Sequence, residues 1–113
     1  MTQEDKNLLL KDLCARLPYE TYIEIVDKNG NVHDEVELGP EHINVARYDE
    51  STSIRPYLRP KASMTEEEYQ EFGYDVLRYT PREFDWLNAH HFDCRGLIEK
   101  GLALEAPEGM YKN

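Results

Sequence analysis

The chain begins with a pattern of leucines. Over residues 3–17 they recur at spacings of three and four, which places them on one face of a helix. Thr2 has a side chain typical of a helix cap, and Pro18 ends the pattern because proline does not continue a helix. The pattern predicts an N-terminal helix over residues 3–17 whose buried stripe consists of Leu9, Leu10, Leu13 and Leu17.

Residues 19–38 alternate between apolar and acidic positions on either side of Asn29-Gly30, the dipeptide most typical of a two-residue hairpin turn. Such a turn pairs Ile23 with Val36. The apolar face then consists of Thr21, Ile23, Ile25, Val36 and Leu38, and the opposite face of Glu20, Glu24, Glu35 and Glu37. This sorting predicts an antiparallel hairpin with one face on the core.

Two further segments complete the predicted sheet. Residues 42–48 fit a third strand, and residues 54–58 fit a short fourth strand. Pro56 has no backbone N–H, so we expect this fourth strand at an edge of the sheet. The prediction is a meander of three or four antiparallel strands over residues 19–58, either flat or curled into a small open barrel.

Helix signals follow the sheet. Overlapping capping boxes at residues 63–66 and 65–68 predict the start of a helix that extends over residues 65–79. Gly73 lies inside this segment and is a position where the helix can break, because glycine is a poor helix former.

Two more helix starts lie further along the chain. Thr80 is a capping residue followed by proline, which predicts a helix that ends near His90. Asp93 is a second capping residue, and a short helix from there would end before Gly101. The helical part is thus predicted over residues 65–101.

Composition limits the size and the partners of the protein. With 113 residues there is room for one core, so we expect a single α+β domain over residues 1–113 with an extended tail over residues 102–113. The chain has 23 acidic and 13 basic residues and a net charge of −10, which opposes direct binding to nucleic acid or to anionic membranes. Without a long apolar run or a basic signal sequence, the expected location is cytoplasmic.

Residues with metal-binding or nucleophilic side chains concentrate at His90, His91, Asp93 and Cys94. Adjacent helical residues point about 100° apart, so the two histidines do not easily bind one ion, and we predict neither a metal site nor a cofactor. In a reducing compartment Cys14 and Cys94 are expected as free thiols. An alternative is a small thiol enzyme in which His90 or His91 activates Cys94 at a helix N-terminus.

One short segment is basic: residues 54–64 carry three bases and no acid. Alternation places Arg55, Tyr57 and Arg59 on one side of an extended chain, and arginine and tyrosine are enriched in interface hot spots. Together with Trp86 and His90 they form a predicted binding patch for an unidentified protein partner. The competing interpretation is that these cations pair with acids of the same chain.

The preferred interpretation of the sequence is a small acidic, non-catalytic interaction or accessory protein, of unspecified oligomeric state. Besides the thiol enzyme, a third hypothesis is an inhibitor whose acidic side chains imitate nucleic acid. This inhibitor would need its acids spaced along one rigid face.

Three blocks of the sequence are similar to a known group of proteins. They read MTQEDKNLLLKDLCARLPY, IRPYLRPKASMTEEE and FDWLNAHHFDCRGLIEKGLALEAPEGMY. The chain resembles a group of small uncharacterised proteins from gut anaerobe genomes, with phage or other mobile elements as a candidate origin. The resemblance implies no activity, cofactor or site residue. Members of the group carry tyrosine in place of Cys94, which weakens the thiol enzyme hypothesis.

Overall fold

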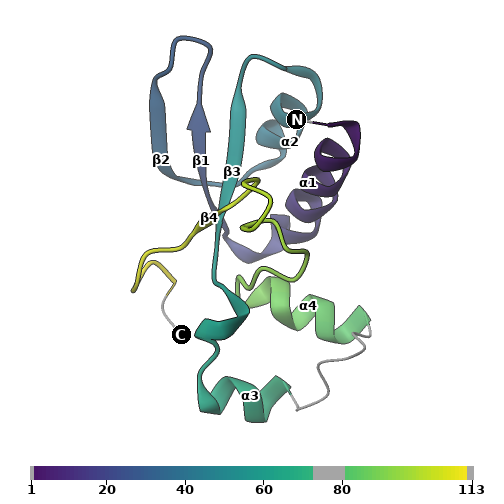
Figure 1. Ribbon diagram of the computed structural model, residues 1–113, viewed down its shortest axis with the longest axis vertical. Helices are drawn as coiled ribbons and strands as arrows, with labels where there is room; N and C mark the ends of the chain where they lie inside the picture. Colours follow the sequence, from purple (N-terminus) through teal and green to yellow (C-terminus); the bar gives the residue numbers. More distant parts are fainter. Residues whose placement is uncertain (1, 73–80, 112–113) are drawn as a thin grey trace.

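The protein is an α+β fold in a computed structural model that describes residues 2–72 and 81–111 (Figure 1). Within these residues the helices are α1 (Gln3–Arg16), α2 (Pro40–Tyr48), α3 (Glu66–Phe72) and α4 (Pro81–Ala89). The mixed sheet has the order β2-β1-β3-β4 and is not closed into a barrel; its strands are β1 (Tyr22–Val26), β2 (Val32–Glu37), β3 (Ser53–Leu58) and β4 (Leu104–Glu105).

The hydrophobic core lies between the sheet and the pair α1 and α2 (Figure 1). Leu9 and Leu13 of α1 are buried there, so the predicted N-terminal helix is confirmed. Thr2 caps it as expected, because its hydroxyl oxygen accepts a hydrogen bond from the backbone N–H of Asp5 (3.1 Å). No helix within the described residues is both long enough and apolar enough to cross a membrane.

The turn of the β1–β2 hairpin differs from the prediction. Asp27 donates its backbone N–H to the carbonyl of Asn31 (3.0 Å), so the loop holds three residues, 28–30, instead of two. The Asp27 carboxylate accepts hydrogen bonds from the amides of Asn29 (2.9 Å) and Asn31 (3.0 Å). Gly30, with φ of 81°, supplies the left-handed residue that a three-residue loop requires. The aspartate side chain therefore favours the longer loop.

A bulge in β2 restores the predicted register at the base of the hairpin. Beside the turn, Val26 pairs with Val32, one residue away from the predicted partner, whereas Ile23 pairs with Val36 as predicted. Between these pairs Glu35 has φ of 56°, and the strand absorbs the extra residue there. The two departures from the predicted register cancel, and Val36 packs against the core.

The predicted third strand is wrong, because residues 42–48 belong to α2. Pro40 stands at the start of this helix, and the Gly39 N–H donates to Nδ1 of His42 (2.8 Å). Ile43 is the buried residue of α2. In a segment of this length a few apolar residues fit a short strand and one turn of a helix equally well, and the start signal at Gly39-Pro40 decides for the helix.

The predicted fourth strand corresponds to β3, but β3 lies inside the sheet and not at its edge. It pairs antiparallel with β1 and parallel with β4, so the sheet is mixed and the antiparallel meander is not formed. Pro56 is tolerated because β4 pairs only with Tyr57 and Leu58, beyond the proline.

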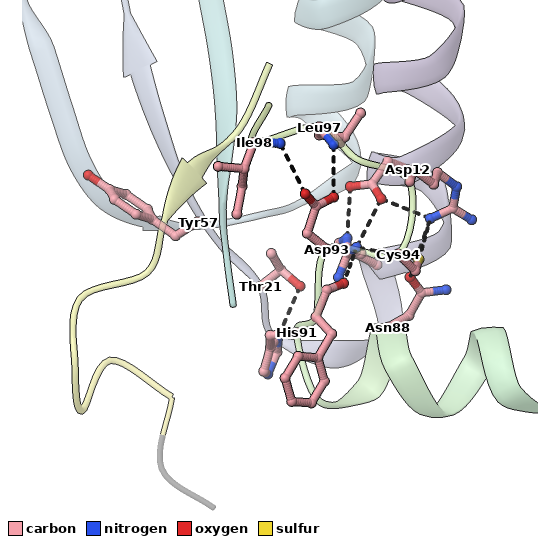
Figure 2. Close-up of polar contacts among 12 residues, drawn as sticks. Asp12, Thr21, Tyr57, Asn88, His91, Asp93, Cys94, Leu97 and Ile98 are labelled. Atoms are coloured by element: carbon pink, nitrogen blue, oxygen red, sulfur yellow. Dashed lines mark hydrogen bonds and ion pairs between the residues drawn. The ribbon is translucent and has the colours of Figure 1, made fainter. Parts of the chain in front are cut away.

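The part of the chain after α4 is less helical than predicted. Helices α3 and α4 start near the predicted positions, and the possible break at Gly73 lies outside the described residues. The segment from Asp93 to Lys100 forms turns instead of a helix. The Asp93 carboxylate caps these turns by accepting hydrogen bonds from the amides of Leu97 (2.9 Å) and Ile98 (3.0 Å) (Figure 2).

Candidate functional site

The face of the sheet turned away from α1 and α2 carries polar and aromatic side chains. In β3, Ile54 and Leu58 are buried, whereas Arg55 and Tyr57 between them are only partly buried, as the alternation predicts. Cross-strand pairing places side chains of β1 and β2 beside this row. We call this surface the open face; it consists of Tyr22, Glu24, Asp34, Glu37, Arg55 and Tyr57.

Two contacts across the open face join residues of the predicted binding patch to neighbouring acids. Arg55 lies opposite Glu24 and forms an ion pair with it (Nη2 to Oε1, 2.7 Å). Tyr57 donates its hydroxyl to Oδ1 of Asp34 (2.6 Å). Burial raises the pKa of Tyr57 to about 12, together with this hydrogen bond and the charges of Asp34, Glu24 and Glu35. Tyr57 is therefore a neutral donor at physiological pH.

The open face keeps an excess of negative charge. It holds three carboxylates, from Glu24, Asp34 and Glu37, against the one guanidinium of Arg55. Glu37 and the neighbouring Glu35 are exposed, and neither forms an ion pair with another described residue. A positively charged group approaching this face therefore meets carboxylates that are not already neutralised.

A second cluster lies where β3 leads toward α3. Arg59 binds Glu68 of α3 through two parallel hydrogen bonds (2.7 and 2.8 Å), and its guanidinium lies over the ring of Phe92 (4.1 Å to the centroid). The hydrogen bonds from Arg59 lower the pKa of Glu68 to about 2, with support from the Thr65 amide. This ion pair therefore fixes the start of α3 against β3.

Trp86 and His90 of the predicted patch belong to this second cluster. Their rings stack with centroids 3.9 Å apart, and Trp86 also stacks on Phe92 at 5.9 Å. The indole N–H donates to Oε1 of Glu71 in α3 (3.1 Å), and Nδ1 of His90 lies 2.9 Å from the Trp86 carbonyl oxygen. These contacts hold α3 and α4 together.

The five predicted binding residues therefore lie in two places. Arg55 and Tyr57 are on the open face, whereas Arg59, Trp86 and His90 lie between β3, α3 and α4. The structure does not bring them together into one patch, because β3 ends at Leu58 and Arg59 pairs instead with Phe92, in an isolated bridge outside the four strands.

A buried charge cluster connects α1 with the segment after α4 (Figure 2). The fully buried Arg16 binds Asp12 through two hydrogen bonds (2.7 and 2.9 Å) and donates to the carbonyl of Phe92 (2.7 Å). Arg95 donates to the same Asp12 carboxylate (2.8 Å). The leucine pattern that predicts α1 does not indicate this cluster. The one available signal is the four-residue spacing of Asp12 and Arg16, which is typical of an ion pair within a helix.

The thiol of Cys94 lies at the rim of this buried cluster (Figure 2). Its sulfur is 3.3 Å from Nη1 of Arg95 and 3.5 Å from Oδ1 of Asn88. Burial raises the pKa of the Cys94 thiol, while the guanidiniums of Arg16 and Arg95 act in the opposite direction. The thiol form is therefore favoured over the nucleophilic thiolate.

Neither candidate base of the thiol enzyme hypothesis is hydrogen-bonded to Cys94. His90 is engaged with the Trp86 carbonyl, and Nδ1 of His91 lies 3.4 Å from the Thr21 hydroxyl. Within the described residues, no three His, Cys, Asp or Glu side chains are arranged to hold a metal ion.

The chain was compared with protein-family models, curated proteins and solved structures, and no match was found.

Proposed function

We propose that this protein is a small non-catalytic interaction protein whose open face binds a basic segment of a partner protein. The observation that carries the proposal is the excess of carboxylates on the open face beside two partly exposed tyrosines, Tyr22 and Tyr57. Tyrosine supplies a large contact area at a low cost in conformational entropy, and it is enriched in interface hot spots.

Charge favours a basic partner. The net charge of −10 attracts cationic surfaces over long distances, and the carboxylates of the open face give the encounter a preferred site. An arginine of the partner can pair with Glu37, which has no ion pair with another described residue, and can stack on a neighbouring tyrosine. In this proposal Arg59, Trp86 and His90 stabilise the fold and do not touch the partner.

The environment of Cys94 supports a non-catalytic role. A thiol nucleophile requires a lowered pKa or a base in contact with it. Cys94 has a raised pKa, and both neighbouring histidines are hydrogen-bonded to other groups.

The proposal is tested by affinity capture from an extract of the cells that produce the protein, with mass spectrometry of the bound proteins. The full chain is compared with an Asp34→Lys, Glu37→Lys variant. The control variant, Glu67→Lys, Glu99→Lys, makes the same change in net charge at two exposed positions away from the sheet. Thermal unfolding verifies that all three proteins are folded.

We expect one partner with a basic segment to bind the wild type and the control, and to be lost from the open-face variant. Binding should weaken steeply with salt, because charges on an exposed surface are screened over about 8 Å at physiological ionic strength. A partner that the open-face variant retains, or whose binding does not depend on salt, would contradict the proposal.

A further inference from the structure

The hydroxyl of Tyr111 is inserted between two strands. The antiparallel ladder of β1 and β3 ends at the pair Ile23 and Pro56, and the next pair would join Tyr22 to Tyr57. Instead, the Tyr22 N–H donates to the Tyr111 hydroxyl oxygen (2.9 Å), and this hydroxyl donates to the Tyr57 carbonyl (2.7 Å). One phenol group therefore satisfies a backbone donor and a backbone acceptor at the point where the strands separate.

The ring of Tyr111 stacks on two other rings. Its centroid lies 3.7 Å from that of His91, with 10° between the planes, and 5.7 Å from that of Tyr22, with 25° between the planes. We call this site the tyrosine slot; it consists of the Tyr22 ring and N–H, the Tyr57 carbonyl and the His91 ring. All three residues belong to segments outside the C-terminal tail.

The walls of the tyrosine slot are held independently of Tyr111. The His91 carbonyl accepts a hydrogen bond from the Arg59 N–H (2.7 Å). The ring nitrogen Nδ1 of His91 contacts the Thr21 hydroxyl (3.4 Å) (Figure 2). Tyr22 and Tyr57 are fixed by β1 and β3. Tyr57 also pairs with Leu104 of β4, so the walls of the slot belong to the sheet and to the segment after α4, and not to residues 106–111.

Beyond β4, residues 106–111 of the tail make few hydrogen bonds to the rest of the protein apart from the two of the Tyr111 hydroxyl. Ala106 donates to the Leu58 carbonyl (2.8 Å), and the next backbone hydrogen bond among the described residues is internal to the tail, from Met110 to Pro107 (3.1 Å). A cavity of about 430 Å³ lies between the tail and residues 59–65. The cavity separates residues 106–109 from residues 59–65, so release of residues 106–111 disrupts little packing other than the ring contacts of Tyr111.

From this geometry we infer that the tyrosine slot is a recognition site for a tyrosine side chain of a partner protein, occupied here by Tyr111 of the same chain. A phenol matches the slot because it supplies an aromatic face, a donor and an acceptor. A phenylalanine in the slot would leave the Tyr22 N–H and the Tyr57 carbonyl without hydrogen-bond partners. Unpaired buried polar groups of this kind discriminate strongly between tyrosine and phenylalanine.

The position of Tyr111 and the net charge of the whole protein support exchange with a partner. Among the described residues no helix or strand follows β4, so Tyr111 can leave the slot without moving one of them. A second copy of this chain is the less suitable source of the incoming tyrosine, because two molecules with a net charge of −10 repel each other. The occupant is therefore a tyrosine in another protein.

The experiment uses the full chain with the substitution Tyr111→Ala, and N-acetyl-L-tyrosinamide as the probe. Binding is followed by NMR through the Tyr22 amide and the His91 ring, which report on the slot itself. We expect the variant to bind this probe about tenfold more tightly than N-acetyl-L-phenylalaninamide, because only the phenol replaces both hydrogen bonds. The wild type should bind the probe more weakly than the variant, because Tyr111 competes.

Equal binding of the two amides, or no perturbation of the Tyr22 amide at saturating probe, would overturn the inference. If the variant does not fold, the wild type is titrated with an amidated peptide of residues 105–111 that carries 3-fluorotyrosine. The inference is supported if the fluorine signal shifts on binding and if unlabelled peptide with tyrosine displaces the labelled peptide better than the same peptide with phenylalanine. An unshifted fluorine signal overturns the inference. A wild-type dimer that Tyr111→Ala abolishes would place a second copy in the slot and overturn the assignment to a partner.

Discussion

Arg16, near the C-terminal end of α1, donates a hydrogen bond to the backbone carbonyl of Phe92, 76 residues away in the sequence, over 2.7 Å. This contact is possible because Asp12 compensates the buried guanidinium from the preceding turn of the same helix. The first helix and the segment after α4 are therefore connected through a charge that is completely removed from water.

Replacement of Asp12 by Ala should destabilise the protein strongly. It leaves the guanidiniums of Arg16 and Arg95 without their shared carboxylate, and an uncompensated buried charge costs about 3–5 kcal/mol. Urea unfolding measures the change. The control Glu4→Ala removes an exposed carboxylate from the same helix and should cost less than about 1 kcal/mol. A similar loss for both variants would show that Asp12 is not essential to the cluster.

The two arginine ion pairs should differ in strength. The side chains of Arg59 and Glu68 are 13% and 8% exposed, whereas Arg55 in the pair with Glu24 is 36% exposed. In double-mutant cycles with alanine, we expect a coupling energy of about 1–3 kcal/mol for the first pair and less than about 1 kcal/mol for the second. Urea unfolding of the single and double variants gives both values, and a reversed order would contradict the prediction.

Stability should depend on pH through His91. Burial is the main cause that lowers the pKa of His91 to about 4 from its ordinary value of 6.5. Between these pH values the unfolded chain binds a proton that the folded chain does not bind, so the free energy of unfolding should decrease as the pH falls from 6.5 to 4. Denaturant unfolding across this range measures the slope.

The variant His91→Asn is the control for this slope. Asparagine tolerates the positive φ of 65° at this position and does not titrate, so the variant should lose the His91 contribution to the slope. Glu68, with a pKa lowered to about 2 from 4.5, causes a separate loss of stability at lower pH, between these two values. An unchanged slope in the variant would mean that another group titrates.

The two cysteines should react at different rates. Cys14 is exposed, whereas Cys94 is partly buried and its thiol pKa is raised. Iodoacetamide should modify Cys94 at least about tenfold more slowly than Cys14 in the native protein, because the thiolate is the reactive form. In denaturant the two rates should converge. Peptide mass spectrometry measures both, and a faster reaction at Cys94 would favour the thiol enzyme.

The parts of the fold that were predicted correctly depend on neighbours in the sequence. The leucine spacing and Thr2 define α1, and the capping box at Thr65 defines the start of α3. The pairing of Ile23 with Val36 follows from the sorting of apolar and acidic residues, and it is correct although the turn is one residue longer.

The parts that were not predicted depend on contacts between distant segments. The pairing of Tyr57 with Leu104 places β3 inside the sheet, and a two-residue strand such as β4 has no pattern of its own. Likewise, Arg16 and Arg95 meet at Asp12 only after the chain has folded back. In the candidate site, the alternation of Arg55 and Tyr57 was predicted, but the end of β3 separates Arg59 from them.

The bulge at Glu35 has a consequence for aggregation. Strand β2 stands first in the sheet order, and within the described residues its outer side has no neighbouring strand. A regular strand in this position is a template for the edge of another molecule. The left-handed residue at Glu35 interrupts the row of backbone donors and acceptors, and the acidic side chains on either side repel a second copy of the same strand. The irregular strand thus protects the protein against edge-to-edge pairing of its sheet with that of another molecule.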